Sequence, residues 1–150
     1  MLFDTHAHYD DDQFDPDREA LLASLPERGV GLVVNPGCTV ASSRTAVELA
    51  RRFPHVYAAV GIHPENCGDF RPEDLDAIRA LAREDKVVAI GETGLDYYQM
   101  EERKGGRGIA DMEWQRERFR THIQASNASG LPLIVHTRDA GADTLRLLSE

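Results

Sequence analysis

Two histidines with a single residue between them, His6 and His8, follow the first apolar stretch of the chain, in MLFDTHAHYD. Residues two apart on a β-strand point to the same face of a sheet, so a strand here would direct both imidazoles to one side. Imidazoles on one side can hold a divalent metal ion. The same short spacing also occurs in surface and capping histidines, so the rest of the chain must decide.

Polar residues interrupt the later apolar stretches in a similar way. The segments GIHP, GETGLDYY and VHTRD carry His63, Glu92, Asp96, His136 and Arg138. Imidazole nitrogen and carboxylate oxygen are ordinary ligands of zinc and manganese. A glutamate can also bridge two ions, and paired ions can activate a water and stabilise a phosphate in transfer. If the ends of these apolar stretches lie side by side, their histidines and glutamate predict a divalent metal site.

Two of these residues have more than one interpretation. His63 could be a metal ligand, a phosphate contact or a turn residue before Pro64, and we favour contact with substrate. The planar guanidinium of Arg138 can bind two phosphate oxygens at once. The alternative for Arg138 is a salt bridge to Asp139 or Glu92.

Strand-like and helical stretches alternate along the chain. Apolar runs bounded by Gly or Pro predict strands within residues 1–8, 29–37, 56–64, 86–98 and 131–139. Helical spacing of apolar residues predicts helices within 15–25, 39–53, 71–85, 111–130 and 139–150, with Asp111 as a helix cap. Runs that are apolar throughout are typical of parallel strands covered on both faces. We therefore expect residues 1–150 to form one α/β domain.

Two parallel architectures fit this alternation, an open doubly wound sheet and a (β/α)₈ barrel. In both, active sites lie at the carboxyl ends of the strands, where the polar residues of this chain fall. No Gly-x-Gly-x-x-Gly motif follows the first strand, which disfavours a dinucleotide-binding sheet. The glycine-rich KGGRG at 104–108 follows no strand, and we interpret it as a loop insertion rather than a phosphate cradle.

Other residues of reactive type are expected to have smaller roles. We expect His55 to lie solvated in a turn and His122 to be packed or hydrogen-bonded within a helix. Cys38 is expected to be a small buried residue rather than a nucleophile. Tyr97 and Tyr98 could stack on a base or ring, although packing by at least one of them is an equal alternative.

The net charge of −9 argues against a broad nucleic-acid-binding face, which needs clustered Lys and Arg. An anionic substrate would therefore need a metal ion to supply positive charge. No apolar run approaches the roughly 20 residues that span a bilayer, and the N-terminus lacks the pattern of a signal peptide. The two cysteines suit a reducing compartment. We expect a cytoplasmic protein that does not bind membranes.

Five segments, FDTHAHYD, GIHP, IGETGLDYY, QRERFRTHIQAS and LPLIVHTRDA, resemble in that order the motifs of the TatD-type metal-dependent deoxyribonucleases. The resemblance implies a (β/α)₈ TIM barrel of the metal-dependent hydrolase superfamily, of which this chain supplies about the first five β/α units. It also implies two divalent ions (Mg, Mn or Zn) and hydrolysis of DNA phosphodiester bonds. The substrate implied is single-stranded DNA or a nucleic-acid end, cleaved from the 3′ side.

The resemblance also implies roles for individual residues. His6 and His8 would hold one ion, Glu92 would bridge, and His136 would hold the second ion. Glu92 and His136 are the catalytic candidates. The candidates for substrate binding are His63, Asp96 and Arg138.

Two further ligands of the family pattern, a histidine after strand six and an aspartate after strand eight, would follow residue 150. We therefore expect a chain that is the N-terminal part of a barrel and that can self-associate through its open sheet edges. An amidohydrolase or lactonase acting on a small molecule is the first alternative function. An inactive fragment is the second.

Overall fold

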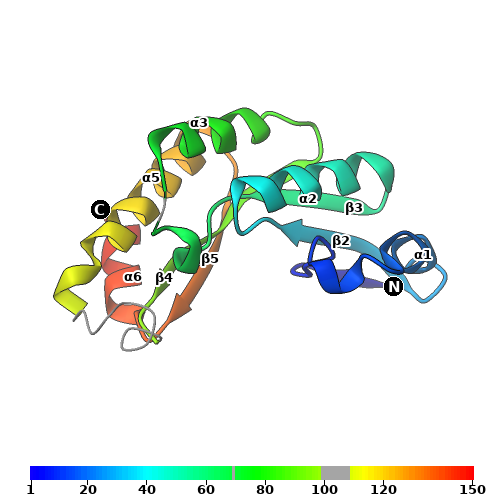
Figure 1. The fold of residues 1–150 in the computed structure, drawn as a ribbon, viewed down its shortest axis with the longest axis horizontal. Coiled ribbons are helices and arrows are strands. Elements are labelled where there is room, and N and C mark those ends of the chain that lie inside the picture. Colours follow the sequence, from blue (N-terminus) through cyan, green and yellow to red (C-terminus); the bar gives the residue numbers. More distant parts are fainter. Residues whose placement is uncertain (69, 99–108) are drawn as a thin grey trace.

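Five parallel strands form one curled sheet in the order β1-β2-β3-β4-β5 (Figure 1). The computed structural model describes residues 1–68, 70–98 and 109–150. The strands are β1 Leu2–Asp4, β2 Val30–Pro36, β3 Val56–Val60, β4 Val87–Asp96 and β5 Leu133–Arg138. Within the described residues β1 and β5 are the outer strands, the two edges on which the expectation of self-association rests.

Helices follow the strands in alternation. They are α1 Arg18–Ser24, α2 Val40–Arg52, α3 Pro72–Leu81, α5 Glu113–Ser129 and α6 Gly141–Leu148. Local sequence explains their ends: Thr39 and Ser42 form a reciprocal capping box at the start of α2, and Gly130 ends α5 in the left-handed conformation. The expected cap at Asp111 is wrong, because a 3₁₀ turn over Ile109–Met112 leads into α5 and Met112 is its N-cap residue. None of the helices in the described ranges is long and apolar enough to cross a bilayer.

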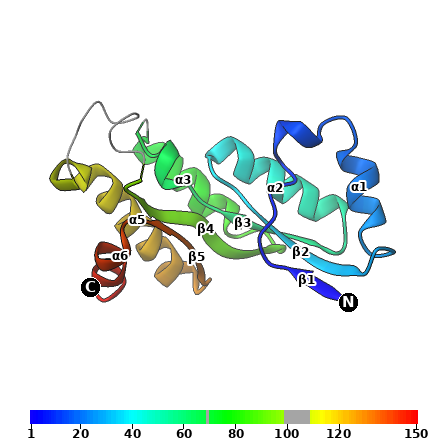
Figure 2. The ribbon, with the colours of Figure 1, turned by 90° about the horizontal axis from the view of Figure 1, so that it is seen from below.

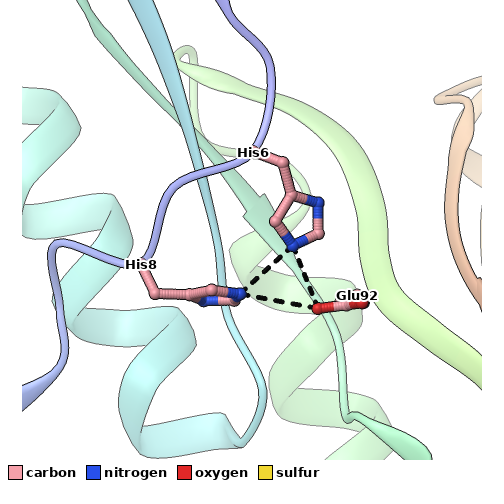
Figure 3. Close-up of side chains that lie close together, drawn as sticks. All are labelled: His6, His8 and Glu92. Atoms are coloured by element: carbon pink, nitrogen blue, oxygen red, sulfur yellow. Dashed lines mark hydrogen bonds and ion pairs between the residues drawn. The ribbon is translucent and has the colours of Figure 1, made fainter.

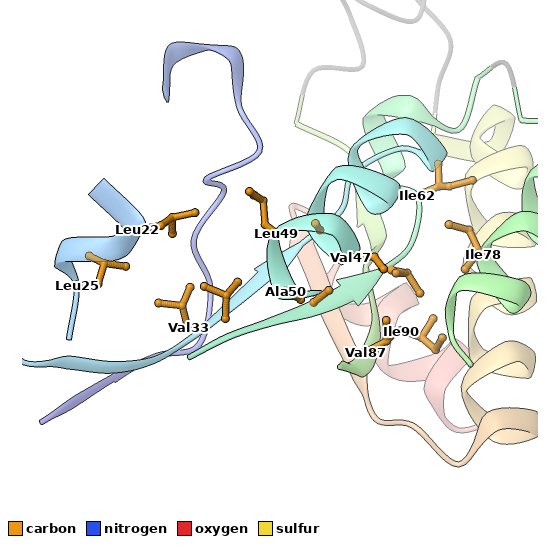
Figure 4. Packing of buried hydrophobic residues seen from close by; sticks show 14 of the residues in the cluster. Leu22, Leu25, Val33, Val47, Leu49, Ala50, Ile62, Ile78, Val87 and Ile90 are labelled. Atoms are coloured by element: carbon orange, nitrogen blue, oxygen red, sulfur yellow. The ribbon is translucent and has the colours of Figure 1, made fainter. Parts of the chain in front are cut away.

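The main hydrophobic core lies between the sheet and the helices. Helices α1, α2 and α3 lie along one side of the sheet (Figure 2). Leu22 of α1, Leu49 of α2 and Ile78 of α3 pack there against strand residues such as Val33 (Figure 4). Each such side chain contributes about 1.5–3 kcal/mol when it is removed from water. A second cluster, which includes Leu95 and Phe119, joins α5 and α6 to β4.

The other face of the sheet is covered differently. Val34, Ala59 and Ala89 are buried there by Tyr57, Val88 and Ile134, all of which lie on the strands themselves. Small residues on this face are expected where a sheet curls and its inner side chains converge. A sequential strand order with helices on one face is the arrangement of a barrel, whereas a doubly wound sheet has helices on both faces. The structure thus decides between the two architectures left open by the sequence.

Two strand boundaries differ from the prediction. β1 ends at Asp4, so His6 and His8 lie beyond the strand and not on it. The backbone N–H of Ala7 still donates to the carbonyl of Val34 at 3.1 Å, which keeps this segment beside β2. β4 continues through Glu92 to Asp96, so Glu92 lies within a strand rather than at its end. The KGGRG segment at 104–108 lies outside the described residues.

Candidate metal centre

The side chains of His6 and His8 point toward that of Glu92, which lies far away in the sequence (Figure 3). The Nε2 atoms of His6 and His8 lie 3.1 Å apart. Glu92 Oε2 lies 3.1 Å from His6 Nε2 and 3.6 Å from His8 Nε2. A tetrahedral ion with ligands at about 2.0–2.1 Å separates its ligand atoms by about 3.3 Å. The spacing and the donor types of these three residues therefore fit a divalent ion.

The segment that carries His6 and His8 is held by Asn35, at the end of β2. The Asn35 side chain is fully buried; its Oδ1 accepts from the backbone N–H of Tyr9 at 2.6 Å, and its Nδ2 donates to Asp10 Oδ1 at 2.8 Å. One amide thus takes the place of a strand partner for the residues that follow His8. The signal in the sequence was a polar residue at the end of an apolar strand, but Asn35 was not among the site candidates.

A β-bulge in β4 places Glu92. Ile90 pairs with Leu133 and Thr93 with Val135, so β4 has one more residue than β5 over this interval. The bulge needs glycine on both sides of Glu92: a Cβ on Gly91 would lie 2.6 Å from the carbonyl oxygen of Ile134, and Gly94 has a φ of +140°. Bulges of this kind re-aim a side chain beside active sites.

The second oxygen of Glu92 faces the opposite direction. Glu92 Oε1 lies 3.2 Å from Nδ1 of His136, a residue of β5. The His63 ring lies against that of His136, with centroids 4.3 Å apart, and ligand atoms of His63, Glu92 and His136 lie within 4.8 Å of one another. The structure thus brings together all four residues that the sequence analysis named as metal ligands, with His63 beside them.

The outer side of His136 is occupied by Asp96 and Arg138. His136 Nε2 lies 2.9 Å from Asp96 Oδ2, and Arg138 Nη2 lies 2.6 Å from the same oxygen. Arg138 also pairs with Glu65 at 3.0 Å, and its guanidinium lies over the ring of Tyr98 at 4.8 Å. The salt bridge considered from the sequence, to Asp139 or Glu92, is wrong: Arg138 pairs with Asp96 and Glu65.

Mutual contacts shift the pKa values of the site. Contact with Cys38, and then with Glu92, raises the pKa of His8 to about 10, against the opposing effect of burial. Burial alone would raise the pKa of Glu92, but hydrogen bonds from His136 and His8 lower it overall. The same Glu92 raises the pKa of His136, whereas burial lowers that of His63. Carboxylate and imidazolium therefore stabilise each other here, and a cation would replace those protons.

The remaining candidates divide into buried and accessible groups. His122 is fully buried, accepts from the backbone N–H of Ile62 at 3.1 Å and donates to a backbone carbonyl, as predicted. His55 is partly buried and hydrogen-bonds to the carbonyl of Leu22, so its expected solvated position is wrong. Cys38 is only partly buried, with its Sγ 4.0 Å from His8 Nδ1, a cysteine–histidine contact that the sequence did not indicate. Tyr97 is buried and Tyr98 is exposed.

A curled parallel α/β sheet with histidines and a carboxylate at the carboxyl ends of its strands has the arrangement of a metal-dependent hydrolase on a barrel fold. A model of the family described as "TatD related DNase" matches residues 3–150. The chain belongs to this family.

Curated relatives agree with the family match. Over its full length the chain is 37% identical to the "uncharacterized metal-dependent hydrolase YabD" of Bacillus subtilis, of which it covers 56%. It is 33% identical to the "3'-5' ssDNA/RNA exonuclease TatD" of Salmonella typhimurium, in an alignment that covers 98% of this chain and 54% of that protein. The chain thus spans about half the length of the curated relatives that it matches.

Solved structures share the fold. A TatD homolog of Escherichia coli K12, YJJV, matches with a TM-score of 0.85 and 27% identity over 99% of this chain and 55% of that one. An uncharacterized amidohydrolase of Saccharomyces cerevisiae matches with a TM-score of 0.77 over 99% of this chain and 51% of that one. At 23% identity the second likeness concerns the fold alone. The prediction of a TIM-barrel hydrolase fold, of which this chain supplies five β/α units, is confirmed.

Proposed function

We propose that the protein carrying this chain hydrolyses phosphodiester bonds at the 3′ ends of single-stranded DNA with two divalent ions. The observation that carries the proposal is the two-sided position of Glu92. Its Oε2 faces His6 and His8, and its Oε1 faces His136. A carboxylate so placed can hold two cations at a fixed separation, as two-metal hydrolysis requires.

His6, His8 and Glu92 would hold one ion, and Glu92 and His136 would hold the second. When bound, the ions supply Lewis acidity, which activates a water and offsets the negative charge on a phosphate. His8 and His136, whose pKa values are raised, must each lose a proton to bind an ion, while Glu92 stays ionised at neutral pH because its pKa is lowered.

His63 offers a hydrogen-bond donor to the substrate. Its Nδ1 accepts from the backbone N–H of Glu65 at 3.2 Å, so the neutral ring carries its proton on Nε2. Burial lowers the pKa of His63 and favours this neutral form. A ring locked in this tautomer can donate to a phosphate oxygen.

Arg138 and Tyr98 supply the contacts expected for a nucleotide. Arg138 lies at the rim with its side chain 39% exposed, and its planar fork suits phosphate oxygens. Tyr98 is exposed beside it, and an exposed aromatic ring can stack on any base. Such contacts bind a single strand without a broad basic surface, which agrees with the net charge of −9. The name of the Salmonella relative, a 3'-5' ssDNA/RNA exonuclease, supports this substrate class.

We also place the protein in the cytoplasm, because both of its cysteines are free.

The test is the Glu92→Gln variant of the natural full-length protein, assayed on single-stranded DNA labelled at either end. Gln keeps the shape but lacks the charge that holds two cations, so we expect a loss of bound metal and at least about a 100-fold lower kcat/KM. Glu84→Gln is the control, because Glu84 pairs with Arg51 on the surface. Unchanged metal content and turnover in Glu92→Gln would refute the two-metal site.

The acidic net charge favours one second candidate, a hydrolase of small amides or lactones. Such an enzyme needs the same ions but does not need to bind a polyanionic substrate. Assays of the wild-type protein on cyclic amides and lactones, run beside the DNA assay, separate the two. Turnover of a lactone with no cleavage of DNA would favour this candidate.

A further inference from the structure

We infer that Asp96 is a positioning residue for the metal centre: it holds His136 so that Nδ1, and not Nε2, is the nitrogen offered to the ion. The inference rests on the proposed metal site and gives a different part to a residue that the sequence suggested for substrate binding. The Asp96 side chain is only 2% exposed, which leaves almost none of its surface to a substrate.

Both carboxylate oxygens of Asp96 accept hydrogen bonds from neighbouring residues. Oδ1 accepts from the backbone N–H of Tyr98 at 3.1 Å. Oδ2 accepts from Nε of Arg138 at 2.9 Å and lies 2.9 Å from His136 Nε2. The guanidinium of Arg138 and the backbone N–H of Tyr98 can only donate, so the carboxylate that receives them is the acceptor in this cluster.

The backbone of Asp96 is held as firmly as its side chain. Its N–H donates to Gln115 Oε1 at 2.8 Å, and its carbonyl accepts from Gln115 Nε2 at 3.2 Å. β3 ends at Val60 and does not reach this part of β4, so the amide of Gln115 does for Asp96 what a neighbouring strand would do. Gln115 is buried within α5 and also reaches the carbonyl of Pro64, beside His63. A buried helix residue thus fixes Asp96 relative to the rim.

A fixed acceptor determines the tautomer of its partner. Because Asp96 cannot donate, the proton between it and His136 must belong to Nε2 of the imidazole. A neutral His136 then presents the lone pair of Nδ1 toward Glu92 Oε1, 3.2 Å away. Without an ion, the imidazolium form of His136 donates to both carboxylates. With an ion bound, the cation takes the place of the Nδ1 proton and the Nε2 proton stays with Asp96. Carboxylates that hold metal-binding histidines in this way strengthen metal binding.

The first test compares Asp96→Asn with Asp143→Asn in the full-length protein. Mn²⁺ affinity is measured from the paramagnetic resonance of free Mn²⁺, and thermal unfolding is measured without metal. Asn has no charge and only one acceptor oxygen, which Arg138 and His136 would have to share, so His136 would be held less firmly. Asp96→Asn should therefore weaken one Mn²⁺ site about 10- to 100-fold. Asp143 is the matched control: its carboxylate accepts from Tyr97, the neighbour of Asp96, and from Arg146, but it lies away from the ligands. Asp143→Asn should lower the unfolding temperature and leave the Mn²⁺ affinity within about threefold.

A second measurement determines the tautomer in the wild-type protein itself. In ¹⁵N-histidine-labelled wild-type protein loaded with Zn²⁺, the His136 signals should show the proton on Nε2, with assignment from His136→Gln. A proton on Nδ1, or equal Mn²⁺ affinities in Asp96→Asn and wild type, would overturn the inference alone. Wild-type protein that binds neither ion would overturn the proposed function and this inference with it.

Discussion

The two sides of Glu92 are built in different ways. His136 lies within β5, and its outer nitrogen is 2.9 Å from the buried carboxylate of Asp96. His6 and His8 lie beyond β1 and are about one-third exposed. Among the described residues, the contacts of the outer nitrogen of His8 are longer, 3.9 Å to Asp10 and 4.0 Å to Cys38. One half of the site is therefore positioned by the sheet before any ion binds. The other half depends on the backbone hydrogen bond from Ala7 to Val34, on the buried amide of Asn35 and on the bound ion.

The largest effect is expected from a change on the sheet side, Gly94→Ala. Gly94 has a φ of +140°, and a Cβ there would collide with the carbonyl oxygen of His136. We expect a loss of about 3 kcal/mol or more in the free energy of unfolding, since neither strand can move without breaking the sheet. Urea unfolding of the full-length protein measures this loss.

Gly141→Ala is the control, because nothing lies within 4 Å of a Cβ at that position. If Gly94→Ala proves as stable as Gly141→Ala, the close approach of β4 to His136 is not a constraint, and the sheet side is less rigid than described.

A smaller effect is expected from Asn35→Ala on the N-terminal side. The change leaves the backbone N–H of Tyr9 and the carboxylate of Asp10 without their partner, which costs about 1–3 kcal/mol. Because Asn35 holds only the segment of His6 and His8, the affinity for one of two ions should fall while that for the other is kept. Mn²⁺ titration resolves the two sites.

Asn66→Ala serves as the matched control, since Asn66 is exposed and donates a single hydrogen bond to the carbonyl of Cys38. Equal weakening of both ions in Asn35→Ala would contradict the division of the site into two separately supported halves.

The smallest effect concerns pH and His8. Its folded-state pKa of about 10 is above the ordinary value of 6.5, so its contribution to stability is complete below about pH 6.5 and is lost as the pH rises toward 10. In the metal-free protein, wild type should exceed His8→Gln in unfolding free energy at pH 6, and the difference should shrink by pH 10. Metal binding has the opposite dependence, because the ligands must lose protons. A difference that grows with pH in EDTA would show that His8 is not stabilised as an imidazolium.

The half of the site that contains His136 was predictable from the sequence, whereas the half that contains His6 and His8 was predictable only in part. Apolar runs that end in polar residues placed His136 and Glu92 on one rim, because parallel strands bring their carboxyl ends together. The end of β1 at Asp4 depends on pairing with β2, which no local pattern encodes. The roles of Asn35 and Gln115 in holding the site could not be predicted either, because each side chain hydrogen-bonds to the backbone of a segment that is distant in the sequence. The burial of Asp96 could not be read from the sequence either, and it is the observation on which the positioning role inferred above depends.

The most direct test of the account is a crystal structure of the full-length protein with Mn²⁺, using anomalous scattering to place the ions. The account predicts two peaks on opposite sides of the Glu92 carboxylate. One should contact His6 and His8 through Nε2, and the other should contact His136 through Nδ1. A single peak, or two peaks of which only one contacts Glu92, would contradict it.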